Sequence, residues 1–396
     1  MVMLTHLRAE KCGASVPVVW DGGVVAAWSN RANGRDAIAE IAGAARVHDV
    51  GFLLIFASSY YDPRDIVDGL AAHFPDVPHA GCSTAGEIGP TGIADRSLVA
   101  LAFPKDDFDI ACSYFETTDD FSVELVAELV AELCHRLDLD RTAEAGHGFA
   151  LTLLDGLGRH EELVLAALQG ALDDIPMVGG SLGDDLAFTS TFAFCDGRTF
   201  RGANLVLLIR TDRPFELFKS DHFLPTSSKL VVTACDPDLR VVTELNAESA
   251  WLAFAEAAHV DPDVRIGINF AAHPLLVRVG GEYYCRSIQK LNDDNSLSFY
   301  CAIDTGVILT VAKTKDMVAT LEETLSSLEN RLGGLDFVLG FDCIHRRLEA
   351  ENRQIVHQIS DIFRRFRVFG FSTYGEQYNA MHLNHTFSGV AFGRRQ

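Results

Sequence analysis

The chain alternates between short, continuous apolar runs and longer segments whose apolar residues recur every three or four positions. A continuous apolar run of strand length is typical of a strand buried on both faces, and the three-to-four spacing is typical of an amphipathic helix. The strand-to-helix order is clearest at three places: 51–57 followed by 65–74, 148–154 followed by 161–172, and 337–341 followed by 347–366. The pattern predicts a mixed α/β (α+β) fold built from repeated strand–helix–strand units.

The remaining apolar segments complete this picture. We expect helices over 124–137, 248–258 and 314–332, and strands over 98–103, 188–194, 204–209, 266–270, 275–279, 282–286, 298–303, 307–311, 368–371 and 386–392. The composition loosens near Asp236-Pro237, so we place a boundary between residues 235 and 247. We therefore predict two sheet-based domains flanked by helices, over 31–240 and 241–396, preceded by a lead-in over 1–30.

Each predicted unit leads to a glycine-rich turn that carries an acidic residue. The turns cover 81–87, 179–184 and 370–376, and the first and third share the pattern Gly-x-Ser-Thr-x-Gly-Glu. Consecutive amides and hydroxyls in such turns can hold an anionic or polar ligand. The alternative is a tight exit from a strand, in which Ser, Thr and the carboxylate cap neighbouring amides. The candidate pocket residues are Gly81, Cys82, Ser83, Thr84, Glu87, Gly180, Ser181, Asp184, Ser372, Thr373, Tyr374 and Glu376.

The second turn also matches the Gly-x-Ser-x-Gly motif of serine hydrolases, with Ser181 as the nucleophile. That motif requires a helix directly after the turn. Here Asp184-Asp185 and a strand-like segment follow instead. A hydrolase therefore remains a minor alternative.

A dense polar and aromatic segment, residues 374–386, lies between the last two predicted strands. A neutral imidazole or a phenolate can bind haem iron, which makes His382 the first candidate and Tyr378 the second. His382 and His385 could instead share a transition metal. The structural alternative is a loop in which the side chains of His382, His385 and Asn384 form hydrogen bonds with backbone groups.

Two arginines interrupt apolar surroundings and are candidates for binding an anionic group. Arg346 lies where a predicted strand gives way to a helix, and Arg286 follows a strand. A guanidinium suits bidentate contact with a carboxylate or propionate. For each arginine, an exposed position on the surface is the alternative.

The composition limits which classes of partner the protein can bind and which cellular compartment it can occupy. The 396 residues carry 33 basic and 55 acidic side chains, a formal charge of −22, which disfavours nucleic acid and anionic membrane surfaces. The nine cysteines are scattered without a Cys-x-x-Cys pair, as in a reducing compartment. We recognise no signal peptide and no run of 18 apolar residues. We expect a soluble, cytoplasmic protein.

Several of these motifs together resemble the FIST family, a two-part sensory module of signal-transduction proteins. The first part is matched by residues 81–87 and 175–184, and the second by His273-Pro274-Leu275, Arg286-Ser287-Ile288, Cys343-Ile344-His345-Arg346 and Tyr374-Gly375-Glu376. The resemblance implies a sensor of small ligands such as amino acids, and no enzyme.

Residues 375–382 and 302–306 are similar to a branch that binds haem b and reports nitric oxide. That similarity implies haem b as cofactor and a separate histidine kinase, diguanylate cyclase or phosphodiesterase as partner. His385 stands where the resemblance leads us to expect glutamine.

Overall fold

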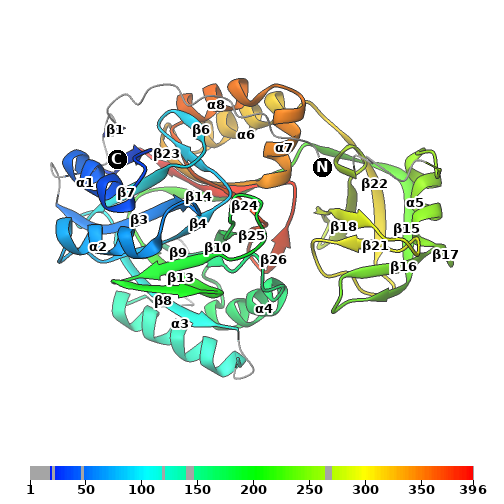
Figure 1. Ribbon diagram of the computed structural model, residues 1–396, viewed down its shortest axis with the longest axis horizontal. Helices are drawn as coiled ribbons and strands as arrows, with labels where there is room; N and C mark the ends of the chain where they lie inside the picture. The colour runs from blue at the N-terminus through cyan, green and yellow to red at the C-terminus, as the bar shows by residue number, and fades with distance from the viewer. Residues whose placement is uncertain are drawn as a thin grey trace.

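The structure is a computed structural model that describes residues 18–19, 23–45, 49–117, 121–139, 147–263 and 270–395. Most of the predicted lead-in and residues 266–269 of the predicted strand over 266–270 lie outside these ranges. The described chain forms a larger lobe, made of three sheets, and a smaller lobe with a single eight-stranded sheet (Figure 1).

Three units of one design build the larger lobe. In each unit, one or two helices connect two parallel strands. A third strand runs antiparallel and pairs with the first of these two strands. The units are β3 (Val50–Ser58), α2 (Pro63–His73), β4 (His79–Thr84) and β7 (Leu98–Pro104); β9 (Gly148–Leu154), α4 (Glu161–Leu172), β10 (Met177–Ser181) and β13 (Ala203–Arg210); and β23 (Leu335–Cys343), α7 (Ile344–Asn352), α8 (Val356–Arg365), β24 (Val368–Thr373) and β27 (Phe387–Gly393). The predicted mixed α/β fold with repeated units is confirmed.

The three units exchange hairpins in a cycle. The hairpin after the first glycine turn, β5 (Glu87–Gly89) with β6 (Gly92–Ala94), pairs with β24 of the third unit. The hairpin after the third turn, β25 (Glu376–Tyr378) with β26 (Met381–Leu383), pairs with β10 of the second unit. The hairpin after the second, β11 (Phe192–Cys195) with β12 (Arg198–Arg201), pairs with β4 of the first. Each unit therefore completes the sheet of another.

The centre of the larger lobe is where the three sheets face one another. Alternate residues of the three leading strands meet in one apolar cluster: Phe52, Leu54 and Phe56, Phe149, Leu151 and Leu153, and Phe337, Leu339 and Phe341. The intervening residues of these strands pack outward, against α1 (Gly34–Ala45) and α2, α3 (Val123–Leu137) and α4, or α6 (Met317–Arg331) and α8. Burial on both faces explains the continuous apolar runs.

The smaller lobe is formed by residues 223–314. Its sheet has the order β19-β18-β22-β15-β16-β21-β20 with β17 beside β16, and α5 (Ala250–Ala258) covers one face around Trp251 and Phe254. The bounds are β15 (Phe223–Asp236), β16 (Val241–Leu245), β17 (Glu248–Ser249), β18 (Leu275–Val279), β19 (Glu282–Arg286), β20 (Ile288–Leu291), β21 (Leu297–Phe299) and β22 (Ile308–Thr314), with a 3-10 turn at Phe270–Ala272. The boundary predicted at 235–247 falls inside the β15–β16 hairpin.

Local expectations needed correction at three places. The helix expected over 347–366 is two helices, because Gln354 adopts a left-handed backbone between α7 and α8. The strand expected from 188 starts at Phe192, because Asp184 binds the preceding amides. The strand expected over 298–303 is confined to β21. Strands not expected from the pattern include β1 (Val18–Val19), β2 (Val25–Ser29), β8 (Asp109–Glu116) and β14 (Phe215–Ser220), and β15, β16 and β20 of the smaller lobe.

Candidate functional site

The three glycine turns converge on one another. Backbone hydrogen bonds link the first turn to the third (Ala85 N to Ser372 O, 3.0 Å; Ser372 N to Gly86 O, 2.7 Å), the second to the third (Ser181 N to Gly375 O, 2.7 Å) and the second to the first (Gly183 N to Ser83 O, 3.3 Å). The turns thus form the joint between the three units.

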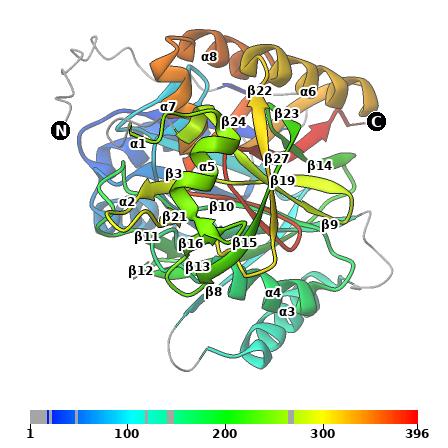
Figure 2. The ribbon, with the colours of Figure 1, turned by 90° about the vertical axis from the view of Figure 1, so that its right-hand side faces the viewer.

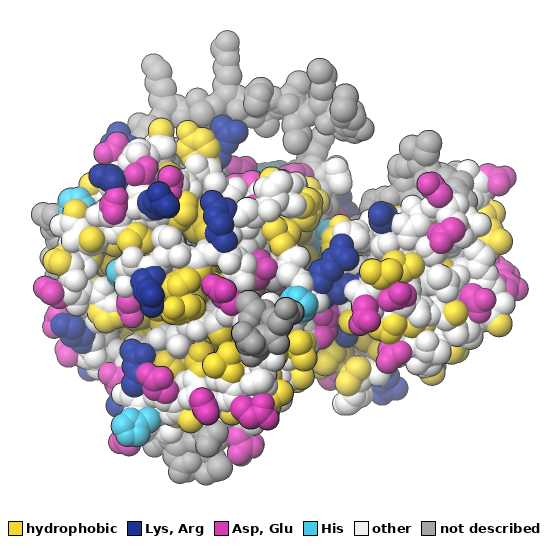
Figure 3. Space-filling view, turned by 60° about the horizontal axis from the view of Figure 1, so that its bottom comes forward, with side chains coloured by type: hydrophobic (Ala, Val, Ile, Leu, Met, Phe, Trp, Pro, Cys, Tyr) yellow, Lys and Arg dark blue, Asp and Glu magenta, His cyan; other side chains and the backbone are white. Residues whose placement is uncertain are grey.

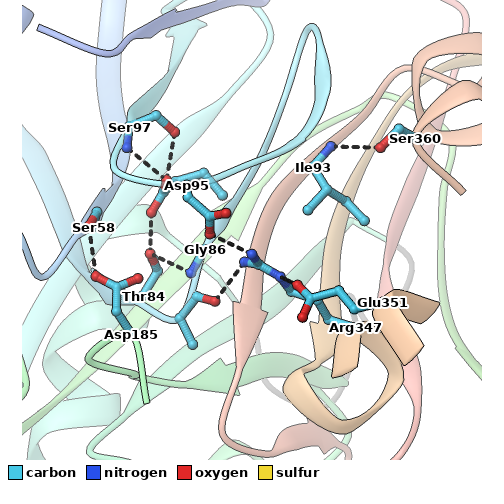
Figure 4. A network of polar contacts seen from close by, with 12 residues as sticks. Ser58, Thr84, Gly86, Ile93, Asp95, Ser97, Asp185, Arg347, Glu351 and Ser360 are labelled. Atoms are coloured by element: carbon cyan, nitrogen blue, oxygen red, sulfur yellow. Dashed lines mark hydrogen bonds and ion pairs between the residues drawn. The ribbon is translucent and has the colours of Figure 1, made fainter. Parts of the chain in front are cut away.

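The acidic residue of the first turn, Glu87, accepts hydrogen bonds from residues on both sides of the hairpin that follows the turn. Glu87 is fully buried, accepts from Thr84 Oγ1 at 2.5 Å, and accepts from the backbone and hydroxyl of Ser97 at 3.1 and 2.6 Å. Figure 4 shows this network, with Arg347 donating to the Ala85 carbonyl (3.0 Å) beside it. Burial, only partly offset by these hydrogen bonds, raises the pKa of Glu87 to about 8.

The third turn repeats the arrangement. Thr373 donates to Glu376, and Glu376 Oε2 accepts from the backbone and hydroxyl of Thr386 at 3.2 and 2.6 Å. Burial raises the pKa of Glu376 to about 8 as well. In both turns the carboxyl is used within the fold, which favours the capping alternative over a ligand-binding turn.

The second turn uses its acid differently. Asp184 accepts from the amides of Phe188 (2.9 Å), Thr189 (2.6 Å) and Ser190 (3.0 Å), and from the phenol of Tyr374 at 2.6 Å. Burial opposes ionisation, but these hydrogen bonds outweigh it and lower the pKa of Asp184. The loop that they fix contains three non-glycine residues with left-handed backbones: Asp185, Leu186 and Phe188.

The buried hydroxyls of Ser83 and Ser181 in the first two turns are also engaged. Ser83 Oγ accepts from the Phe192 amide at 3.0 Å, and Ser181 Oγ accepts from Gln377 Nε2 at 2.9 Å. Ser181 is fully buried, and an amide rather than an imidazole contacts its hydroxyl. This is not the environment of an activated nucleophile.

A cavity of about 550 Å³ lies between the two lobes. The smaller lobe contributes Leu239, Arg240, Gln289, Phe299 and Tyr300, and the larger lobe contributes Gly156, Leu157, Arg159, Glu161, Leu186, Phe188, Thr189, Ile344, His345, Leu348 and Tyr374. Its size is within the range of small-molecule sites, and a mainly apolar wall with a few convergent polar groups is their usual character. Figure 3 shows Lys and Arg side chains, in dark blue, where the lobes meet.

A second cavity of about 270 Å³ adjoins the first, and the two share Gln289, Tyr300, His345 and Leu348. The imidazoles of His345 and His385 line it, with ring centres 4.8 Å apart. Burial lowers the pKa of His345 to about 4 and that of His385 far below its usual value, so both rings are neutral at pH 7. His345 Nδ1 and His385 Nε2 have no hydrogen-bond partner in the described part of the protein.

The first cavity also presents charge. Arg159, on the loop before α4, is exposed on its rim. Arg240 is buried in its wall, 2.9 Å from Glu161 and 2.7 Å from Glu162. Apolar side chains at the mouth, Leu186, Phe188 and Leu239, remain 39 to 60 % exposed. The walls therefore combine exposed apolar side chains with two guanidinium groups and the carboxylate of Glu161.

Of the candidate residues chosen from the sequence, Tyr374 is the one that lines the first cavity. His382 lies buried on β26, its ring against Gly375 and its Nδ1 without a partner in the described residues. Tyr378 is half-buried on β25. Neither is among the residues that line the two cavities. His382 and His385 have different neighbours, since the ring of His382 lies against Gly375 and that of His385 lies against His345.

The remaining candidates are tied into the interior near the lobe junction. Arg346 donates to Asp342 at 2.6 Å and contacts His222 at 3.1 Å. Arg286 donates to the carbonyl of His382 at 3.3 Å, and Asn384 accepts from the Cys301 thiol at 2.5 Å. Gly81 and Cys82 lie on β4 and Gly180 on β10, all buried. Ser372 Oγ has no partner among the described residues.

Comparison with known proteins decides the family. The FIST N domain model matches residues 51–248, and the FIST C domain model matches residues 245–379. The chain belongs to the FIST family. FIST domains are sensory domains of signal transduction rather than catalytic domains. No curated protein matches the chain.

Within this FIST protein, the cavity spans both matched domains, so its walls come from residues up to about 200 positions apart. Sequence reasoning did not select Arg159, Arg240, Tyr300 or His345 for the site, although His345 precedes the chosen Arg346. The feature of the sequence that could have indicated His345 as a site residue is its position just after the end of a strand, β23. No three His, Cys, Asp or Glu side chains within the described ranges converge as a metal site, and no helix there is long and apolar enough to span a membrane.

Proposed function

We propose that this FIST protein senses a small molecule that binds in the cavity between its lobes, and that it signals through a separate polypeptide. The observation that carries the proposal is the interlobe position of the 550 Å³ cavity, with walls from both lobes. A ligand that contacts both lobes can change their relative position, which is a direct route from binding to signal.

Haem b, with nitric oxide as the signal, is the first ligand to test. The cavity offers aromatic walls, Arg159 on its rim for a propionate, and the neutral imidazole of His345 for the iron. Bound haem would supply an iron that takes up nitric oxide reversibly. The protein's part is to hold the iron, to shield it with Phe188 and Tyr374, which are stacked at 4.9 Å, and to fix the propionate end. The cavity walls thus favour His345 over His382 and Tyr378 as the residue that would hold it.

A non-haem ligand, such as an amino acid with an aromatic side chain, is the second candidate. Arg159 would pair with its carboxylate, and the rings of Tyr300 and Tyr374 would contact its side chain. Such a ligand leaves the protein colourless and raises its melting temperature with concentration.

Haemin titration tests the first ligand. We expect a Soret band that shifts on addition of nitric oxide, loss of that band in His345→Ala, and its retention in His382→Ala and in the exposed control His357→Ala. Loss in His382→Ala with retention in His345→Ala would place the iron at His382 instead. Absence of any Soret band, with stabilisation by amino acids, would select the second ligand.

A further inference from the structure

The two lobes are joined by two chain crossings. One runs from β14 to β15 through Asp221 and His222, and the other from β22 to α6 through Lys315 and Asp316. At this point Lys315 N donates to His222 O at 2.7 Å, so the crossings lie side by side. No described strand of the eight-stranded sheet pairs with a strand of the other three. Two adjacent crossings have the form of a hinge.

The lobes share no apolar core among the described residues, and they meet through polar contacts and through the ring contacts Tyr300–His345 and Phe223–His385. Every hydrophobic cluster of the described residues belongs to one lobe: two clusters to residues 223–314 and five to the larger lobe. Small or polar interfaces between parts of one chain permit relative motion, whereas a shared apolar core prevents it. The positions of the lobes therefore depend on specific polar contacts.

One group of these contacts, an ion-pair cluster, centres on Arg240, in the turn between β15 and β16. Its guanidinium lies 2.9 Å from Glu161 and 2.7 Å from Glu162, in the first turn of α4 on the larger lobe. It also donates to the carbonyl of Tyr300 in its own lobe. Glu162 in turn accepts from the amide of Ala302 at 2.8 Å, so two loops of the smaller lobe are held by one helix start.

We name this cluster of Arg240, Glu161 and Glu162 the Arg240 latch. The Arg240 latch lies in the wall of the larger cavity. Arg240 and Glu161 line the cavity directly. Arg240 and Glu161 are less than one-tenth exposed, so the ion pair is poorly screened by solvent. In Figure 1 the chain crosses between the lobes near the top of the view, whereas α4 lies near the bottom. Figure 2 shows the smaller lobe in front of the larger one.

We propose that the Arg240 latch holds a hinged pair of lobes closed, and that ligand in the cavity acts by shifting the balance between latched and unlatched lobes. The ligand part of this inference rests on the proposed function; the latch itself does not. A ligand that touches Tyr300 on one lobe and Tyr374 on the other binds the closed arrangement better, and so favours it. The latch sets how much of the ligand-free protein is already closed.

The test uses full-length, ligand-free protein and two readouts: the radius of gyration from small-angle X-ray scattering, and hydrogen exchange at the Ala302 amide. We expect Arg240→Ala to enlarge the radius and to lower protection of the Ala302 amide about tenfold or more. Arg331→Ala, which removes the exposed Arg331–Glu216 ion pair within the larger lobe, is the matched control and should change neither.

Two further variants separate opening from misfolding. Glu161→Gln/Glu162→Gln keeps the side-chain volumes and the acceptor for Ala302, and should enlarge the radius less than Arg240→Ala. Arg240→Lys, which keeps a cation beside Glu161 and Glu162 and the acceptor for Ala302, should keep the radius closer to wild type than Arg240→Ala does. A wild-type radius and wild-type Ala302 protection in Arg240→Ala would overturn the latch.

Haemin addition is the ligand arm of the test. Compaction of Arg240→Ala by haemin is the result expected when ligand closes the lobes. Haemin that binds without compaction would refute ligand-driven closure. Haemin that does not bind would count against the haem proposal alone and leave the latch result standing.

Discussion

At the scale of single residues, the two buried glutamates of the first and third turns are the most informative. Glu87 and Glu376 each accept from a Thr three residues before and a Ser or Thr ten residues after. Each is fully buried, and none of its hydrogen-bond partners among the described residues is an arginine or lysine, so each holds its proton more tightly than in the unfolded chain. Carboxyls of this kind make stability depend on pH.

We predict that Glu376→Gln stabilises the protein relative to wild type at pH 8 but not at pH 5. Between its ordinary pKa near 4.5 and its native pKa of about 8, the folded state keeps a proton that the unfolded state has lost, so the wild type loses stability as the pH rises. Glutamine mimics the protonated acid. The expected gain at pH 8 is about 2 kcal/mol, measured by urea unfolding.

The exposed Glu128→Gln on α3 is the control for this comparison. The buried histidines change stability with pH in the opposite direction, because their lowered pKa values make folding more favourable as the pH rises. The difference between variant and wild type cancels that contribution. An equal difference at pH 5 and pH 8 would contradict the raised pKa.

At the scale of elements, the hydrophobic pattern predicted the leading strands and most helices. A strand buried on both faces leaves a continuous apolar run, and a helix buried on one face leaves apolar residues at every third or fourth position. It could not predict the break at Gln354 or the loop over 185–191. In the loop the backbone follows a contact distant in sequence, since Leu186 N donates to the Tyr374 phenol at 2.8 Å. At Gln354 a single residue with a left-handed backbone ends the helix, and the apolar period continues across it. The exchange of hairpins between units likewise leaves no local signal.

The first glycine of each turn marks a close approach between parallel strands. A Cβ on Gly81, Gly179 or Gly370 would lie 2.2, 1.9 or 1.8 Å from a carbonyl oxygen of the neighbouring strand. We therefore predict that Gly179→Ala lowers the free energy of unfolding by about 2–4 kcal/mol, measured by urea denaturation. Gly170→Ala, on an exposed turn of α4 with open space around it, should instead raise it by about 0.5–1 kcal/mol. Equal effects of the two substitutions would refute the close-approach argument.

At the scale of the whole molecule, the sequence indicated a sensory family but not the place of its site. Tyr374 was chosen for its turn, and it reaches the cavity because the third turn faces the smaller lobe. Arg240 and Tyr300 carried no local pattern, since their importance arises from the docking of residues 223–314 against α4 and α7. The cavity is a property of the assembled lobes.

The central claim is that ligand binds between the lobes, and filling the cavity tests it most directly. Leu348 lines both cavities, so Leu348→Trp should occupy their shared wall, whereas Leu163→Trp places the same ring on the exposed face of α4. The measurement is equilibrium haemin binding, followed at the Soret band, for wild type and both variants. We expect at least a tenfold weaker affinity in Leu348→Trp, about 1.4 kcal/mol, and an unchanged affinity in Leu163→Trp. Haemin that binds Leu348→Trp as tightly as wild type would contradict the account.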